Sequence, residues 1–400
     1  MKVLIAEEAL QTGTGHWPGY IGGIASGLRS AGNSVDILVH KNCVPDLYAA
    51  LDGTPVFSRN CWLDPASQGG LGGLRHNFIF RRELKSWICS RSERYDLVCA
   101  LTMRLQHLLA FALMSRARDI PRETHFLLLF VQGFGRYDAT IGKSVFPRNR
   151  STLLARLCFR LMSKAVRSGR IVLAAETKGM QDELERFTGL PVALFPHPVP
   201  PPVLSDKAVV EKKQITLTCP GFARHEKGTD LLQDAILELL SDDKLNHVRF
   251  ILQWPNPFEM PDGSLMQPRE VLTKHPQVEF KNENLNLEEY ESLLQESDII
   301  LLPYRRESYH NRVSRVAIEG AGRGKPLVYM SGTWAAEVAE ISKAGVPIRA
   351  ESGKALAEAI RQAVSEFNSL KVEAETHAEE LIKYHSTERF HQLMQEATVS

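Results

Sequence analysis

Two stretches in which short apolar runs alternate with amphipathic segments are separated by a segment rich in proline. From Pro196 the sequence reads PHPVPPP, with five prolines in seven residues, and a polar, charged run follows. Because proline cannot donate to a β-ladder and stiffens an extended chain, we interpret residues 201–213 as a linker. The chain then divides into a first domain over residues 1–200 and a second over 214–380, each of ordinary domain size. We expect residues 381–400 to form a helix that returns to the first domain.

The first stretch begins with the pattern of a βαβ unit. MKVLIAEE reads as a buried strand, a glycine-rich segment follows, and IASGLRSAGNSVDILVH reads as a helix capped by Gly32 and then a second strand. The right-handed crossover of such a unit places its strands in parallel. YDLVCAL, THFLLLFV and RIVLAAE continue as further strands, so we predict a doubly wound sheet.

The same alternation restarts after the linker. QITLTCPG, HVRFILQW, VEFKN, DIILLPY and KPLVYM read as strands, and the segments between them read as helices, one of them capped by Asn286. From about Lys354 the pattern indicates two further helices. The predicted fold class is therefore α/β, with two consecutive Rossmann-like, doubly wound parallel-sheet domains facing a cleft. In such sheets, ligands bind beyond the carboxyl ends of the strands.

Composition excludes several classes of protein. Hydrophobic residues make up 44% of the chain and charged residues 24%, as in ordinary globular proteins, and the net charge of +1 argues against a nucleic-acid binder. The charge is unevenly distributed, because residues 1–200 carry a net +9 and the remainder a net −8. Glu7 and Glu8 interrupt the first apolar run, so no signal peptide is predicted. No apolar run approaches the ~20 residues of a membrane-spanning helix, and we predict a cytoplasmic protein.

The six cysteines do not form a metal-ligand pattern. They stand singly, without a C-x-x-C pair, and we interpret them as buried or free thiols in a reducing compartment. No D-x-D pattern occurs either. We therefore expect neither a bound metal nor a cofactor.

The loop after the first strand of the second domain is rich in features that bind anions. In PGFARHEKGTD, Gly221 and Gly228 allow sharp turns, Arg224 can grip phosphate oxygens in a bidentate manner, and Lys227 adds a point charge. A helix beginning near Thr229 directs its free amides at the same place. A solvated loop with two surface cations is the alternative explanation.

A second loop has a related pattern further along. In LLPYRRESYHNRVSRVAIEGAGRGKPLVYM, Arg312, Ser314 and Arg315 lie where a helix begins, so their donors can converge on a diphosphate. Glu319 follows one to two turns later, where a carboxylate can accept hydrogen bonds from both hydroxyls of a ribose. The alternative is a helix whose Glu319 faces solvent, but the small residues beside it favour a close contact.

Together, the two loops resemble the retaining nucleotide-sugar glycosyltransferases of family 4, which have the GT-B fold. That family has a glycine, five residues and then Lys-Gly, which corresponds here to Gly221 through Gly228. The resemblance implies that Lys227 binds the donor diphosphate and that Glu319 binds the ribose. It also implies a nucleotide-diphosphate sugar as donor, with the barrier lowered by positioning and by stabilisation of the leaving diphosphate.

This sequence departs from the family pattern at two positions. The family arginine usually follows the first glycine directly, where Phe222 stands, although a subset places it three residues on, as Arg224 is placed here. The family glutamate eight residues before Glu319 is Asn311. Since that glutamate contacts sugar hydroxyls, the sugar and the efficiency of transfer stay open.

The first domain offers weaker candidates. TGTGH, with Gly13, Gly15 and His16, lies where the family has a glycine loop that contacts donor phosphates, although a simple turn would also give this pattern. His16 and Asp138 are our candidates for a general base, and Arg224 and Lys227 for stabilising the leaving group.

A basic helix indicates an acceptor on a membrane. No acidic residue occurs from Ala139 to Ala175, while eight basic residues do, and the pattern over 148–170 predicts an amphipathic helix with leucines on a second face. Such a helix can lie on an anionic membrane, where lipid-linked saccharides reside. A surface helix with its leucines in the core is the alternative.

The sequence favours a hexosyltransferase of glycan biosynthesis. A sugar-nucleotide epimerase or a phosphorylase can use the same fold. Asn311 leaves open a non-catalytic relative that binds the nucleotide sugar. A dehydrogenase is disfavoured, because GTGHWPG lacks the full dinucleotide-binding pattern.

Overall fold

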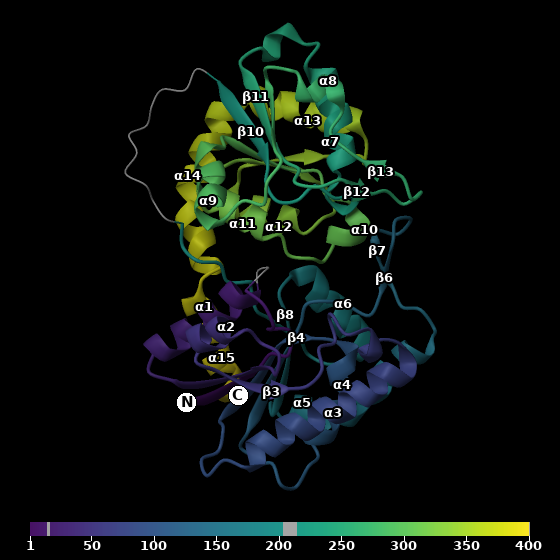
Figure 1. The fold of residues 1–400 in the computed structure, drawn as a ribbon, viewed down its shortest axis with the longest axis vertical. Helices are drawn as coiled ribbons and strands as arrows, with labels where there is room; N and C mark the ends of the chain where they lie inside the picture. Colours follow the sequence, from purple (N-terminus) through teal and green to yellow (C-terminus); the bar gives the residue numbers. More distant parts are fainter. Residues whose placement is uncertain (14–16, 203–213, 400) are drawn as a thin grey trace. The chain divides into compact units, whose positions relative to one another are not determined.

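Two parallel sheets, each covered by helices, form the framework of the protein (Figure 1). The computed structural model describes residues 1–13, 17–202 and 214–399. The chain divides into two units, which are treated separately below. The first comprises Met1–Arg136, Ser144–Pro200 and Ser386–Ser400, and the second comprises Tyr137–Lys143 and Pro201–His385.

The first unit contains a sheet of seven strands in the order β3-β2-β1-β4-β5-β8-β9. Its strands are β1 (Lys2–Ala6), β2 (Ser34–His40), β3 (Gly53–Phe57), β4 (Leu97–Met103), β5 (His125–Phe130), β8 (Ile171–Ala175) and β9 (Ala193–Leu194). Its helices are α1 (Trp17–Ser30), α2 (Pro45–Leu51), α3 (Gly69–Cys89), α4 (Leu105–Met114), α5 (Arg150–Arg167), α6 (Lys178–Thr188) and α15 (Thr387–Val399). β6 (Arg136–Asp138) and β7 (Lys143–Val145) pair in a separate small sheet, of which Tyr137–Lys143 are assigned to the second unit.

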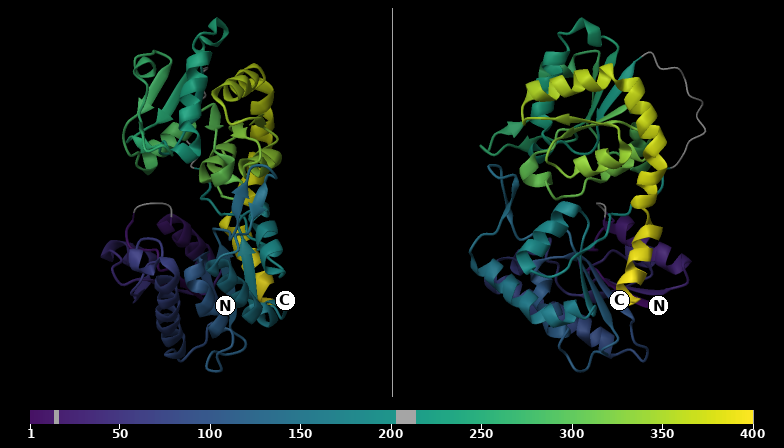
Figure 2. Two further views of the ribbon diagram at one scale, coloured as in Figure 1. Left: turned by 90° about the vertical axis from the view of Figure 1, so that its right-hand side faces the viewer. Right: turned by 180° about the vertical axis from the view of Figure 1, so that it is seen from behind.

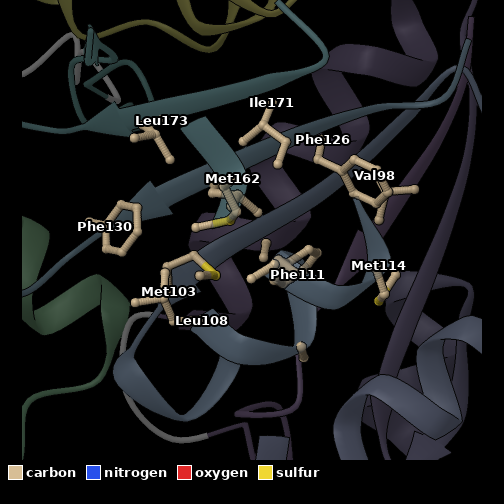
Figure 3. Close-up of a cluster of buried hydrophobic side chains, with 14 of the residues drawn as sticks. Val98, Met103, Leu108, Phe111, Met114, Phe126, Phe130, Met162, Ile171 and Leu173 are labelled. Atoms are coloured by element: carbon tan, nitrogen blue, oxygen red, sulfur yellow. The ribbon is translucent and has the colours of Figure 1, made fainter. Parts of the chain in front are cut away.

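The sheet of the first unit is buried on both faces, because helices cover each. Along β1, Leu4 and Ala6 pack into one hydrophobic cluster, while Val3 and Ile5 pack into another. The first cluster includes side chains from α3, α4, α5 and α6, and Figure 3 shows part of it between α4, α5 and strands β4, β5 and β8. The second includes α1 and α15, so the two chain ends lie near each other (Figure 2). This two-sided cover explains the uninterrupted apolar runs of these strands.

The second unit contains a sheet of six parallel strands in the order β14-β11-β10-β15-β16-β17. Its strands are β10 (Ile215–Cys219), β11 (Val248–Gln253), β14 (Val278–Lys281), β15 (Ile299–Leu302), β16 (Leu327–Met330) and β17 (Gly345–Ile348), with β12 (Phe258–Glu259) and β13 (Leu265–Met266) in a separate hairpin. Its helices are α7 (Thr229–Leu239), α8 (Glu270–Thr273), α9 (Leu287–Glu296), α10 (Arg306–Tyr309), α11 (Arg315–Ala321), α12 (Ala335–Ser342), α13 (Gly353–Ser365) and α14 (Phe367–Tyr384).

Helices also cover both faces of this second sheet. α7 and α13 pack against one face, in a cluster that includes Ile299 and Leu301. On the other face α11 lies so close to β15 that a Cβ on Gly320 would be 2.7 Å from Cγ1 of Ile300. The small residues of α11 therefore serve a close helix–strand contact. The predicted class of two Rossmann-like α/β domains is confirmed.

Several local predictions can be compared with the structure. Asn286 caps α9 by accepting from the Glu289 amide at 3.0 Å, and Gly32 follows α1 with a positive φ, as expected. The C-terminal segment forms three helices rather than two, because the chain turns between α13 and α14 and again before α15. No helix among the described residues is long and apolar enough to cross a membrane.

The face of the basic helix α5 that packs against the core is not the one on which Leu153 and Leu157 lie. Its buried side chains include Ala155, Phe159 and Met162, whereas Leu153 and Leu157 are 64% and 51% exposed. The alternative that places the leucine face in the core is therefore wrong for Leu153 and Leu157, whereas Leu161 of the same face packs against the first cluster. The helix contacts both α4 and α6.

Candidate functional site

The two charged loops of the second unit lie against each other. One follows β10 and the other follows β15, and these strands are parallel neighbours, so both loops leave the same edge of the sheet. The Arg305 amide donates to the Glu226 carbonyl at 2.9 Å, and its Nε donates to the His225 carbonyl at 3.1 Å. The Arg305 guanidinium also pairs with Asp230 at 2.5 Å. Two segments about 80 residues apart in sequence thus form one surface.

Glycine is required at both ends of the first loop. Gly221 has φ +82°, and a Cβ there would lie 2.4 Å from Nζ of Lys227. Gly228 has φ +66°, and its Cβ would lie 2.0 Å from the Pro303 carbonyl oxygen. Both positions have the left-handed conformation that favours glycine, and at Gly228 the close approach is to backbone, which a side chain there could not avoid. The expected sharp turns are therefore present.

Lys227 is half-buried beneath this loop. Its ammonium donates to the Pro220 carbonyl at 3.4 Å, and burial lowers its pKa to about 8. A partly desolvated ammonium lacks much of its hydration shell, so an anion that reaches it would gain more than at a fully solvated lysine. The neighbouring helix α7 begins at Thr229 and presents its first amides nearby.

Two arginines flank a carboxylate at the same edge. Arg224 contacts Oε1 of Glu226 at 3.5 Å, and Arg312 contacts the same oxygen at 3.3 Å. Both guanidinium groups are half exposed, and Arg312 lies over the Tyr309 ring at 5.1 Å. Glu226 thereby holds two cations from different loops close together while leaving their other donors toward solvent.

The helix start of the second loop differs from the prediction in detail. The Ser314 hydroxyl caps α11 by accepting from the Ala317 amide, and it donates to the Tyr304 hydroxyl at 3.3 Å. Arg315 pairs with Oε1 of Glu319 at 2.7 Å. A role of Ser314 and Arg315 in binding phosphate stays a prediction.

Glu319 does not face solvent. It is 9% exposed, and Oε2 accepts from the Tyr290 hydroxyl of α9 at 2.8 Å. The carboxylate is thus held by a tyrosine on one side and by Arg315 on the other. Asn311 lies in the short segment between α10 and α11 and is half-buried.

The first-domain candidates are only partly described. Gly13 is exposed in a bend, and Gly15 and His16 lie outside the described residues. Asp138 is half-buried in β6, and hydrogen bonds from Thr140 lower its pKa. A lowered pKa makes this carboxylate a weaker base, and its role as general base stays a prediction.

Sequence reasoning did not single out Glu226, Tyr290 or Arg305. Glu226 lies inside the predicted loop, and its position between Arg224 and Arg312 depends on the contact between the loops. Tyr290 lies on the preceding helix, where the pattern indicates only a packed aromatic. Its hydroxyl meets Glu319 of α11 through a contact between segments 29 residues apart, and no spacing rule would have found this contact.

Two Rossmann-like domains, with charged loops gathered at the carboxyl edge of the second, define a protein of the GT-B fold class. Residues 214–366 match the family described as glycosyl transferases group 1, and this match covers the whole of the charged edge. Over this part of its length the chain is similar to glycosyl transferases group 1, and its two-domain fold is that of GT-B proteins.

Solved structures of similar fold extend over nearly the whole chain. A glycosyltransferase from Rickettsia africae ESF-5 superposes with a TM-score of 0.67 at 15% identity, covering 99% of this chain and 97% of that one. HepE from Anabaena in complex with UDP gives a TM-score of 0.67 at 14% identity, covering 99% of both chains. A putative UDP-N-acetylglucosamine 2-epimerase from Listeria monocytogenes gives 0.56 at 11% identity, covering 98% and 94%. A search of curated proteins found no match to the sequence.

Proposed function

We propose that this protein transfers a hexose from a nucleotide-diphosphate sugar to a saccharide or lipid-linked saccharide, with retention of anomeric configuration. The observation that carries the proposal is the convergence of Lys227, Arg224 and Arg312 at one sheet edge, with the carboxylate of Glu319 nearby on α11. Three cations suit a diphosphate, and a buried carboxylate suits a ribose diol.

In this proposal, the charged edge of the second sheet stabilises the leaving group. As the bond between the anomeric carbon and the diphosphate oxygen breaks, negative charge grows on the diphosphate. The ammonium of Lys227 and the two guanidinium groups are aimed where that charge develops, which lowers the barrier without a covalent intermediate. The acceptor hydroxyl then bonds to the anomeric carbon and loses its proton, for which His16 and Asp138 are the candidate acceptors. No step in this scheme needs a metal ion.

A membrane-bound acceptor is favoured by the exposed face of α5. Leu153 and Leu157 are exposed on a helix whose charged residues are basic, the combination that binds an anionic lipid surface. We expect the protein to bind anionic vesicles at low salt and neutral vesicles far less. The double variant Leu153→Glu with Leu157→Glu should lose this binding, whereas Leu265→Glu, at a leucine 68% exposed in the second unit, should keep it. Equal partition to both vesicle types would contradict the proposal.

The donor is tested first by thermal shift. UDP, GDP, ADP and dTDP, each with its common hexose conjugates, would be added without metal to the full-length protein. A clear rise in melting temperature with one nucleotide, lost in Glu319→Ala, would identify the donor class. No shift at millimolar ligand, with the protein folded, would contradict the proposal.

Two other functions use the same fold. The structural similarity to a putative epimerase favours an alternative in which a UDP-sugar is isomerised rather than transferred. Asn311, which replaces the family glutamate, favours a relative that binds the nucleotide sugar without turnover. Release of nucleoside diphosphate only when an acceptor saccharide is present supports the transferase and excludes both alternatives.

A further inference from the structure

A second cluster of chemically active side chains lies in the first unit, apart from the proposed donor site. Glu8 follows β1, His76 lies on α3, and His107 lies in the first turn of α4. All three are buried, with exposed fractions of 2%, 1% and 3%. Three segments that are distant in sequence therefore bring one carboxylate and two imidazoles together in the interior.

The side chains of this cluster aim their ligating atoms at one another. Nε2 of His76 lies 2.9 Å from Oε2 of Glu8, and Nε2 of His107 lies 3.1 Å from Oε1. One ligating atom from each of the three residues can be chosen so that all lie within 4.8 Å of one another. Zinc binds nitrogen and oxygen at about 2.0–2.2 Å, which separates neighbouring ligands by roughly 3–3.5 Å in a tetrahedral site. The spacing therefore suits an ion at the centre.

These contacts are not ordinary hydrogen bonds. Within the described chain, Oε2 of Glu8 and Nε2 of both histidines are buried and have no partner in hydrogen-bonding geometry. Buried polar atoms left in this way are costly, and they mark places where an ion or water is bound. Here three such atoms face a common point.

The tautomer of His76 strengthens this conclusion. The Ser67 hydroxyl donates to Asp64 at 3.2 Å, so it can only accept from Nδ1 of His76, 3.0 Å away. In the neutral ring the proton then sits on Nδ1, and Nε2 turns a lone pair toward the carboxylate of Glu8. Either a metal ion or a second proton on Nε2 must lie between them. An oriented Nδ1–H with a free Nε2 is also the arrangement found in metal-bound histidines.

The backbone of Cys61 helps to position Glu8. The Cys61 amide donates to Oε1 of Glu8 at 2.7 Å, while burial raises the pKa of the Cys61 thiol. Arg104 donates to the Cys61 carbonyl at 3.1 Å and so fixes this segment beside the cluster.

One contact opposes ligation. Nδ1 of His107 accepts from the Arg104 amide at 3.3 Å, which places the ring proton on Nε2. Binding a metal through Nε2 moves that proton to Nδ1 and breaks this bond. The bond is long, and its loss costs less than a metal–nitrogen bond contributes.

We propose that Glu8, His76 and His107 bind Zn²⁺ in the first unit. Binding changes no oxidation state. Because all three side chains are buried, the ion lies out of reach of a substrate and is structural. It cross-links the end of β1 to α3 and α4, beside the segment that leads to the glycine-rich loop.

The amount of zinc bound per chain tests this proposal independently of transferase activity. Full-length protein would be stripped with a chelator, exposed to micromolar Zn²⁺, desalted and analysed by mass spectrometry. One zinc per chain is expected. His76→Gln and His107→Gln should weaken zinc binding at least about 100-fold, while His247→Gln, at an exposed histidine of the second unit, should leave it unchanged.

Cobalt replaces zinc in a measurement that requires no variant to fold. Titration of the stripped wild-type protein with Co²⁺ should give the intense visible bands of tetrahedral coordination, saturating at one ion per chain. A wild-type protein that is folded but retains no zinc would overturn the proposal. The imidazoles and the carboxylate of the cluster would then be joined by shared protons rather than by a metal ion. Equal zinc in wild type and in the double His→Gln variant would overturn it as well.

Discussion

The carboxyl edges of the two sheets are built alike but hold their charges differently. In the first unit, Glu8, His76 and His107 are sealed in the interior and face one another. In the second unit, Arg224 and Arg312 are half exposed and share Glu226 without being covered. The same architecture therefore supports a closed cluster in one unit and an open, cationic surface in the other. Exposure, rather than topology, decides which edge can receive a substrate.

The backbone geometry of the second edge gives the largest expected effect. Gly228→Ala should lower the free energy of unfolding by about 3 kcal/mol or more, because a left-handed φ and a clash with the Pro303 carbonyl act together. Gly263→Ala is the matched control, since Gly263 has φ +83° but no atom within 4 Å of an added Cβ. The Gly263→Ala variant should lower the free energy of unfolding by about 1 kcal/mol. Chemical denaturation of both variants measures the free energy of unfolding. Equal losses in the two variants would mean that the contact between Gly228 and the Pro303 carbonyl is not tight.

Lys227 gives the next largest effect. Lys227→Ala should weaken binding of UDP, used as a probe, by about 10- to 100-fold, because a charge-assisted contact to the diphosphate is lost. The melting temperature should change little, since the buried ammonium is poorly solvated. Lys274→Ala, at an exposed lysine of the same unit, should bind UDP normally. Isothermal titration calorimetry measures the affinity of both variants for UDP. Normal binding by the Lys227 variant would mean that the donor site lies elsewhere.

The same lysine predicts a pH dependence. Burial lowers the pKa of Lys227 to about 8, and only its protonated form attracts a diphosphate. Affinity for UDP should therefore fall as the pH rises through about 8, by up to about tenfold per unit. In Lys227→Ala this step should be absent. A pH profile that is identical in the two proteins would assign the step to another group.

Tyr290 gives the smallest expected effect. Tyr290→Phe removes the hydroxyl that donates to the Glu319 carboxylate and should weaken UDP binding by only about fivefold, because Arg315 still holds that carboxylate. Tyr48→Phe, at a partly buried tyrosine of the first unit, is the control and should have no effect. Loss of affinity for UDP with no loss for pyrophosphate would place the effect at the ribose rather than at the diphosphate.

Much of the fold and half of the donor site were predictable from local patterns. Most strands of both sheets follow from uninterrupted apolar runs, and Gly221, Lys227 and Gly228 follow from a spacing that a single loop imposes. The edge strands β3, β9 and β17 and the helices α2 and α3 were not predicted. α3 begins with Gly69, Gly70, Gly72 and Gly73, and its helical state depends on packing against α4 rather than on propensity.

The sequence alone determined what neighbouring residues in the chain can decide: helix caps, glycine turns, buried strands and the order of the two domains. Contacts between distant segments were decided only by the tertiary structure. Glu226 meets Arg312 because β10 and β15 are neighbours, and Glu8 meets His76 and His107 because α3 and α4 pack beside β1 and β4. Local patterns record the conformation of a segment, whereas the partners of a side chain depend on which strands adjoin, and no spacing in the sequence encodes that.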